Sequence, residues 1–281
     1  MKKIDLTVVA FDSNIVRAYL TYMKSNGIMP SKIIALKMDK RINTKTKRII
    51  NIFLGNELST RILLTIRRLR KNLKYRKISE LLLNGCELIP DFAGQFNYSE
   101  YADSVEEIHI DHINDDKLYN YLSGQDCKTF LFTGGGILRD KILGINAAKF
   151  IHIHPGIVPD VKGSDGFFWS FLLRGKAGAS GFYMNVGIDT GDIIIQHEFD
   201  IPVFRKKLLD YSYDDIYRSI LLYLDPIIRA KLLVKLLELY ARNGSFSALP
   251  VTKQDPEGGR TYYFMHKRLR NRVINKLIAN N

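Results

Sequence analysis

The sequence is poor in the features that mark secreted and membrane proteins. It contains only two cysteines, Cys86 and Cys127, in 281 residues. We expect both to be buried thiols in a reducing compartment, because two cysteines cannot brace a disulfide-rich domain. No apolar run reaches the roughly 20 residues that a membrane-spanning helix needs. The opening MKKIDLTVVAFDS has a short apolar stretch that Asp5 interrupts, without a small-residue cleavage site. We therefore expect a cytoplasmic protein without a transmembrane segment.

Acidic residues are almost missing from one segment. Residues 40–77 contain 13 Lys and Arg residues and one acid, Glu57, and hold most of the formal net charge of +13. A solvated basic helix face and a surface for an anionic membrane, a polyanion or an acidic partner both remain open. The whole chain is 46% hydrophobic and 25% charged, which is the balance of a globular protein. We do not expect nucleic acid to be its partner.

Strand and helix patterns alternate along the chain. An apolar run at 3–11, a helical pattern that ends at Gly27 and a second run at 31–38 predict an open α/β sheet. Further along we predict mostly helix over 42–84, strands at 86–90 and 106–110, a helix at 115–122, strands at 128–134, 149–154, 179–186 and 192–201, helices over 210–242, and a turn, an aromatic strand and a basic helix over 250–281. The strands around GIDTG (187–191) are expected to form a hairpin or to return to the same sheet.

The run TGGGIL, residues 133–138, follows one predicted strand and precedes a helix. Unhindered N–H groups at such a place favour anions. The run lacks the Lys-Ser/Thr of a P-loop and the spacing of a dinucleotide fingerprint, so a plain tight turn also remains open. Its position at the carboxyl end of a strand favours a ligand-contacting loop.

Two histidines stand on one face of the strand at 149–154. His152 and His154 point the same way because side chains alternate along a strand, and Pro155-Gly156 then ends the run. Two imidazoles at a strand end favour a functional site over two structurally buried side chains. A metal site is the competing chemistry, since His-x-His with a carboxylate is a plausible ligand set. No third ligand stands at a characteristic spacing, so we expect no metal.

The stretch from Phe150 to Pro202, FIHIHPGIVPDVKGSDGFFWSFLLRGKAGASGFYMNVGIDTGDIIIQHEFDIP, resembles the core of the formyltransferases that use 10-formyltetrahydrofolate, most of all the sugar N-formyltransferases. His154 matches the family's catalytic histidine. The turn after it (Pro155, Gly156, Pro159), the loop glycine Gly163 and the motif Asp189-Thr190-Gly191 match in order and spacing. One residue departs from the family pattern: His152 stands where the family has Asn.

The resemblance implies an α/β fold, with a Rossmann-like formyltransferase domain over 1–205, a mostly parallel central sheet and a small, mainly helical C-terminal appendage over 206–281. It implies 10-formyltetrahydrofolate as the donor. His152 and His154 would hold the oxyanion that develops during transfer, and Asp189 would orient His154 and relay a proton. The residues implied in cofactor binding are Gly134, Gly135, Gly136, Ile137, Leu138, Val186, Gly187, Ile188 and Asp192.

The acceptor amine is expected to belong to an amino sugar or a sugar nucleotide, in a pathway for surface polysaccharide or flagellar sugars. The tail after Phe204 has a helical pattern, unlike the C-terminal β-barrel of methionyl-tRNA formyltransferases. A methionyl-tRNA enzyme and a binding module of this fold without catalysis remain as alternatives, and a homodimer is possible. The residues implied in acceptor binding are Pro155, Gly156, Lys162, Gly163, Tyr262 and Tyr263.

Overall fold

The computed structural model describes residues 1–38, 66, 75, 77–201, 204–255 and 258–279. Of the basic segment 40–77, only Ile66, Tyr75 and Lys77 are described, so the predictions on that segment lie outside the described residues. Residues 77–82 are helical, as predicted for this part of 42–84. None of the helices described is both long and apolar enough to cross a membrane.

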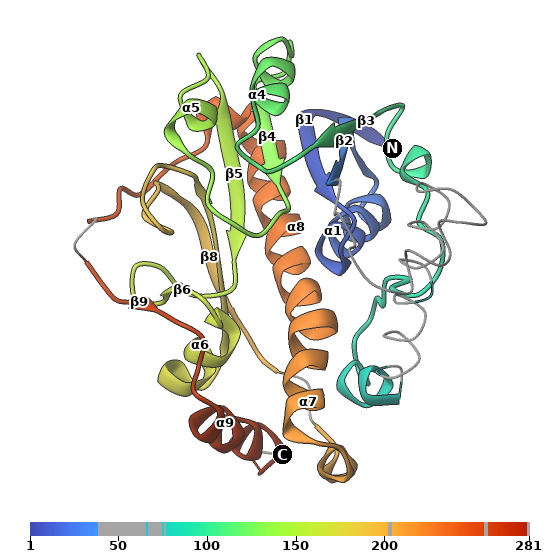
Figure 1. Cartoon of the computed structure of the whole chain (residues 1–281), viewed down its shortest axis with the longest axis vertical. Helices are drawn as coiled ribbons and strands as arrows, with labels where there is room; N and C mark the ends of the chain where they lie inside the picture. Colours follow the sequence, from blue (N-terminus) through green and yellow to red (C-terminus); the bar gives the residue numbers. More distant parts are fainter. Residues whose placement is uncertain (39–65, 67–74, 76, 202–203, 256–257, 280–281) are drawn as a thin grey trace, which may run out of the picture.

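The centre of the molecule is a seven-stranded sheet (Figure 1). Strands β1 to β5 are parallel, and β7 and β8 continue the sheet antiparallel. The order is β3-β2-β1-β4-β5-β7-β8, and its parallel part, 3-2-1-4-5, follows the Rossmann order. The strands are β1 (Lys2–Phe11), β2 (Ile28–Met38), β3 (Ser104–Ile110), β4 (Thr129–Phe132), β5 (Lys149–His154), β7 (Ala177–Tyr183) and β8 (Ile193–Phe199).

Apolar residues on both faces of the sheet explain its two helical layers. On one face, Leu6 and Val8 of β1 share a core with α1 (Asn14–Ser25) and α8 (Asp225–Asn243). On the other face, Val9 shares a second core with α4 (Asp116–Ser123) and α5 (Asp140–Leu143). Figure 1 shows the long α8 running beside the sheet next to α1. The mixed α/β architecture with a mostly parallel sheet is therefore confirmed.

The C-terminal part is mainly helical, as predicted. It contains α7 (Tyr213–Ser219), a π-helix (Ile220–Leu224), α8 and α9 (Lys267–Ala279). Helix α8 contacts β5, β7, β8 and α1, so residues on both sides of 205 belong to one core. The boundary at 205 stays a prediction. The short elements are β6 (Lys162–Gly163), α6 (Gly166–Arg174), β9 (Thr261–Tyr262) and 3-10 turns at Tyr98–Glu100, Lys206–Asp210 and Phe246–Ala248.

The strand predicted at 86–90 is wrong. These residues are irregular and cross the end of α1, where the Tyr22 hydroxyl donates to the Leu88 carbonyl at 3.0 Å. Pro90 has no N–H to donate to a ladder, and the edge of the sheet next to β2 is already occupied by β3. Cys86 and Cys127 are half-buried free thiols.

Candidate active site

The two histidines lie near the carboxyl end of β5, the strand between β4 and β7. Ile151 and Ile153 point into the core beside α8, so alternation sends His152 and His154 to the opposite face. His154 is buried at 3% exposure and His152 is half-buried. Phe182 of β7 lies beside both rings, with centroids 5.9 Å from His152 and 6.4 Å from His154. The predicted common face of the pair is confirmed.

Asp189 reaches His154 from the loop that joins β7 to β8. Its Oδ2 lies 3.3 Å from His154 Nδ1 and accepts a hydrogen bond from the Gly163 N–H at 2.7 Å. The Asp189 backbone has a φ of 54°, the left-handed region that costs an ordinary residue energy. The loop is closed by Asn185, whose side-chain oxygen accepts from Thr190 Oγ1 at 2.7 Å. The structure thus brings together three segments that the sequence separates.

Each histidine also has one ring nitrogen on a backbone carbonyl. His154 Nε2 lies 3.0 Å from the Val161 carbonyl, and His152 Nδ1 lies 3.3 Å from the Phe132 carbonyl. A carbonyl only accepts, so each of these nitrogens carries the proton in its hydrogen bond. The carbonyls therefore fix the ring orientations and select the tautomers.

Burial dominates the charge state of both imidazoles. Desolvation, helped by the buried Arg229 cation, lowers the pKa of His152 to about 3, against the opposing effect of Asp189. Burial also lowers the pKa of His154, and the Asp189 carboxylate offsets part of that effect. Both rings are therefore neutral near pH 7, the form that accepts a proton from an attacking amine.

The glycine loop after β4 combines anchored and open positions. Asn114 holds it, donating to the Ile137 carbonyl at 3.0 Å and accepting from the Arg139 N–H at 2.7 Å. A side chain at Gly134 would collide with Phe11 and Phe132, whereas a Cβ at Gly135 meets nothing within 4 Å. Gly136 has a φ of 108°. Of the five residues predicted to contact folate here, Leu138 is buried in the core, and Ile137 is 56% exposed.

The second predicted folate segment, 186–192, is the same loop that carries Asp189. Val186 is 60% exposed and Ile188 is 45% exposed, so apolar side chains stand in solvent on the loop that carries Asp189. The Gly187 N–H donates to Asn185, and the Asp192 carbonyl accepts from the Tyr183 N–H at 3.0 Å. Exposed apolar groups of this kind suit a flat aromatic ligand.

The residues predicted for the acceptor divide into two groups. Pro155 and Gly156 form the tight turn after β5, where a Cβ at Gly156 would lie 3.0 Å from His154 Nε2. Lys162 and Gly163 form β6, which pairs with Thr261 and Tyr262 of β9. Lys162 is buried and its ammonium donates to the Gly258 carbonyl at 2.8 Å. This pairing brings the Tyr262 segment to the loop that contacts Asp189.

Aromatic side chains cover this small sheet. Tyr262 stacks on Trp169 of α6, with centroids 4.4 Å apart and planes 28° from parallel. The Trp169 indole N–H donates to the Tyr263 carbonyl at 3.0 Å. Tyr263 and Phe264 are 81% and 77% exposed. The two tyrosines predicted to bind the acceptor therefore differ. Tyr262 is held by stacking, and the Tyr263 side chain is exposed to solvent.

Sequence reasoning missed Asp165, which ties the start of α6 to α7 and to the residues after β9. It is buried, and its carboxylate accepts from the Tyr217 hydroxyl and from the Met265 N–H, both at 2.7 Å. Asp165 stands at the N-cap position of α6 but its side chain makes no capping hydrogen bond, and its long-range partners leave no local signal in the sequence.

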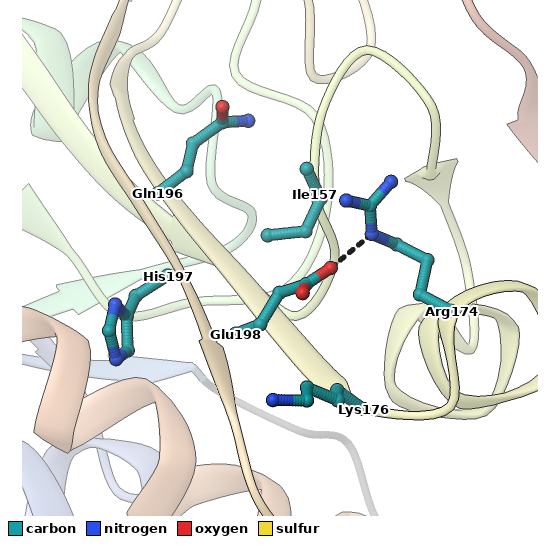
Figure 2. A pocket seen from close by; sticks show the side chains of 6 residues that line it. All are labelled: Ile157, Arg174, Lys176, Gln196, His197 and Glu198. Atoms are coloured by element: carbon teal, nitrogen blue, oxygen red, sulfur yellow. Dashed lines mark hydrogen bonds and ion pairs between the residues drawn. The ribbon is translucent and has the colours of Figure 1, made fainter.

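An open surface pocket of about 420 Å³ lies elsewhere, at the outer side of β7 and β8 (Figure 2). Figure 2 shows Arg174 paired with Glu198 across it. None of the predicted site residues lines this pocket. Its cations are already in ion pairs, Arg174 with Glu198 and Lys176 with Asp200. We base the candidate site on the His154–Asp189 geometry instead. The pocket is lined by Ile157, Arg174, Lys176, Gln196, His197 and Glu198.

Comparison with known proteins returns formyltransferases. A methionyl-tRNA formyltransferase of Syntrophus aciditrophicus (strain SB) is 30% identical over 94 residues, which is 31% of this chain and 30% of the relative. The match thus spans about a third of that relative's length. No protein-family model matches the chain.

Two solved structures are similar over most of the chain. A sugar N-formyltransferase from Shewanella sp FDAARGOS_354 is 13% identical, covering 95% of this chain and 85% of that one, with a TM-score of 0.45. A phosphoribosylglycinamide formyltransferase from Anaplasma phagocytophilum is 16% identical, covering 94% and 100%, with a TM-score of 0.48. Their different acceptors leave the acceptor of this chain to be argued from its own residues.

Proposed function

We propose that this chain is an N-formyltransferase that moves the formyl group of 10-formyltetrahydrofolate to the amine of a nucleotide-linked amino sugar. The observation that carries the proposal is the pair of buried His154 and half-buried Asp189 at 3.3 Å, which lies at the carboxyl end of β5 in a mostly parallel sheet. The formyltransferase motif and the partial sequence match to methionyl-tRNA formyltransferases support it.

The transfer has a balanced course at this site. The neutral amine attacks the formyl carbon, a C–N bond forms, and the formyl oxygen becomes an oxyanion. The tetrahedral intermediate then collapses, the bond from carbon to folate N10 breaks, and the proton lost by the amine passes to N10. His154 and Asp189 carry the proton between them. The one N–H of each neutral ring is held by a carbonyl, so an imidazole donates to the oxyanion only after it has taken up a further proton. A hydrogen-bond donor aimed at such an oxygen contributes about 2.7–4 kcal/mol.

The donor is proposed to lie between the glycine loop after β4 and the loop 186–192. Gly135 is open, and Ile137, Val186 and Ile188 expose apolar surface at the site. A pterin ring buries its faces on such side chains and reads backbone groups with its edge. The other predicted cofactor residues would contribute to folate binding through the backbone of the two loops. They are Gly134, Gly136, Leu138, Gly187 and Asp192.

The acceptor is proposed to enter from the side of β6 and β9. Tyr263 and Phe264 expose two aromatic side chains beside the stacked Trp169 and Tyr262, and aromatic faces bind nucleotide bases and sugars by stacking. The acceptor would contact two further segments between these aromatics and His154. These are the turn at Pro155 and Gly156 and the strand β6 of Lys162 and Gly163. A cytoplasmic pathway for surface polysaccharide or flagellar sugars would use this reaction.

A methionyl-tRNA acceptor is the second candidate, because the sequence match is to such enzymes. The described residues after Phe204 contain helices, the short β9 and one isolated bridge at Thr252, which is not the pattern of a barrel. The experiment therefore offers the purified protein 10-formyltetrahydrofolate with each of three acceptors: nucleotide-linked amino sugars, the free sugars, and methionyl-tRNA. We expect tetrahydrofolate release and a mass gain of one formyl group with a nucleotide-linked sugar. Release with methionyl-tRNA alone would replace the acceptor, and no release with any amine would overturn the proposal.

A further inference from the structure

The hydrogen-bond pattern around His154 leaves one more acceptor than a neutral ring can serve. Nε2 faces the Val161 carbonyl at 3.0 Å and Nδ1 faces Asp189 Oδ2 at 3.3 Å. Both partners accept, and a neutral imidazole carries a single N–H. If Nε2 donates to Val161, a nitrogen lone pair points at a carboxylate oxygen. A metal cation between the two atoms would make this contact favourable.

The neighbouring ring of His152 supports a metal cation at this place. Its Nδ1 donates to the Phe132 carbonyl at 3.3 Å, so the lone pair lies on Nε2. One donor atom each from His152, His154 and Asp189 all lie within 4.8 Å of one another. Two imidazoles and a carboxylate therefore gather at one place, on β5 and on a loop that two internal hydrogen bonds and the Gly163 N–H hold.

The surroundings of the three residues match those of a metal site. Histidines that bind metals have the other ring nitrogen on a carbonyl or carboxylate, and ligating carboxylates accept a further hydrogen bond. Here Val161, Phe132 and the Gly163 N–H supply these three contacts. The distance of 3.3 Å between His154 Nδ1 and Asp189 Oδ2 also equals the roughly 3.3 Å expected between two ligands of a tetrahedral ion with bonds of about 2.0–2.1 Å.

We propose that His152, His154 and Asp189 form a binding site for a divalent transition-metal ion of the zinc type. The sequence offered no third ligand at a typical spacing, and the fold supplies Asp189 from a separate loop. Two imidazoles and one carboxylate favour Zn²⁺ or Co²⁺ over Mg²⁺ and Ca²⁺, which prefer oxygen ligands. The half-buried His152 and Asp189 leave the open side of the ion to water. Because the ion takes up the groups that the proposed formyl transfer needs, its binding inhibits that reaction.

The test is a calorimetric titration of EDTA-treated full-length protein with Zn²⁺, repeated with Co²⁺ and Mg²⁺. We expect one equivalent of Zn²⁺ to bind, a visible d–d band of four-coordinate Co²⁺, and no binding of Mg²⁺. His152→Asn and Asp189→Asn are each expected to weaken Zn²⁺ affinity. The loss should exceed the roughly 10–100-fold that follows when a metal ligand loses its hydrogen-bond partner. The control His197→Ala alters an imidazole outside the cluster and keeps the affinity.

Zn²⁺ should also raise the thermal unfolding midpoint of the wild type and not of His152→Asn, since an ion that binds only the folded state stabilises it. The midpoints without metal show whether each variant is folded. No stoichiometric binding to the wild type, or equal affinity in folded His152→Asn, overturns the proposal. None of these readouts depends on formyl transfer. A protein that binds Zn²⁺ but transfers no formyl group would overturn the proposed function alone.

Discussion

His154 and Asp189 form the contact on which the proposed chemistry depends. The carboxylate is held by the Gly163 N–H at 2.7 Å, and the ring is held by the Val161 carbonyl. The exposed aromatics Tyr263 and Phe264 belong to a separate segment that follows β9. We therefore expect changes at these two positions to affect the chemical step more than acceptor binding.

His154→Ala and Asp189→Asn should each lower kcat by about 10²–10⁴-fold, the usual contribution of a positioned acid or base. The acceptor KM should change little, because the interaction is made in the transition state. Steady-state kinetics with EDTA present would measure both constants. A rise in KM with unchanged kcat would move the pair from catalysis to binding.

His152 offers a sharper comparison because it replaces the family's Asn. An Asn amide can donate to the same oxyanion, so His152→Asn should keep substantial activity in the presence of EDTA. His152→Ala should lose at least about tenfold, or roughly 1.4 kcal/mol of transition-state stabilisation. If both folded variants have the same activity, His152 serves structure or metal binding and not transfer.

At the level of elements, the two loops of the proposed folate site tolerate side chains differently. A Cβ at Gly135 meets open space, whereas a Cβ at Gly191 would lie 1.6 Å from the Tyr183 carbonyl oxygen. The first glycine is free for a ligand, and the second closes the loop that carries Asp189.

Gly135→Val should weaken tetrahydrofolate binding at least about tenfold, since the side chain enters the space proposed for the pterin. Its free energy of unfolding should stay within about 0.5 kcal/mol of the wild type. The matched change Gly191→Ala should cost about 1–3 kcal/mol of unfolding free energy, as overpacking does. Fluorescence titration and urea denaturation give the two quantities. Unchanged folate affinity in Gly135→Val would remove this loop from the cofactor site.

The aromatic residues Tyr262 and Tyr263, at and after the end of β9, have a separate role. Tyr263→Ala should raise the KM of the nucleotide-linked sugar and leave its kcat nearly unchanged, with a loss of about 1–3 kcal/mol if the side chain stacks on a base. Tyr262→Ala should also lower stability, because Tyr262 stacks on Trp169. The control is the free sugar, whose KM should not respond to Tyr263→Ala. An equal response of both acceptors would argue against base stacking.

Across the whole molecule, α8 joins the C-terminal part to the sheet. Leu236 is fully buried in the core that also contains β1, β5 and α1. Leu236→Ala should lower the unfolding free energy by about 2–5 kcal/mol, and the exposed Glu238→Ala should change it by less than about 0.5 kcal/mol. We expect one urea transition by circular dichroism and by tryptophan fluorescence. Two separate transitions would indicate an independent appendage after residue 205.

The features that the sequence predicted correctly are those with a local physical origin. The continuous apolar runs of β1 and β4 are typical of strands buried on both faces, and the common face of His152 and His154 follows from the period of a strand. Helix caps such as Ser13 leave a signal within a few residues of themselves. The strand at 86–90 failed because an apolar segment pairs only where a neighbouring strand has a free edge, and that edge is occupied by β3.

Only the tertiary structure decided which distant segments meet. Asp189 lies 35 positions beyond His154 and reaches it through a left-handed turn and the Gly163 N–H. Lys162 and Gly163 pair with Thr261 and Tyr262, and Asp165 holds Met265. Such contacts depend on how layers pack around the sheet, and no periodicity in the chain encodes them. The sequence therefore shows the chemistry that each residue type can perform. The convergence of two imidazoles and a carboxylate at one site arises from long-range packing.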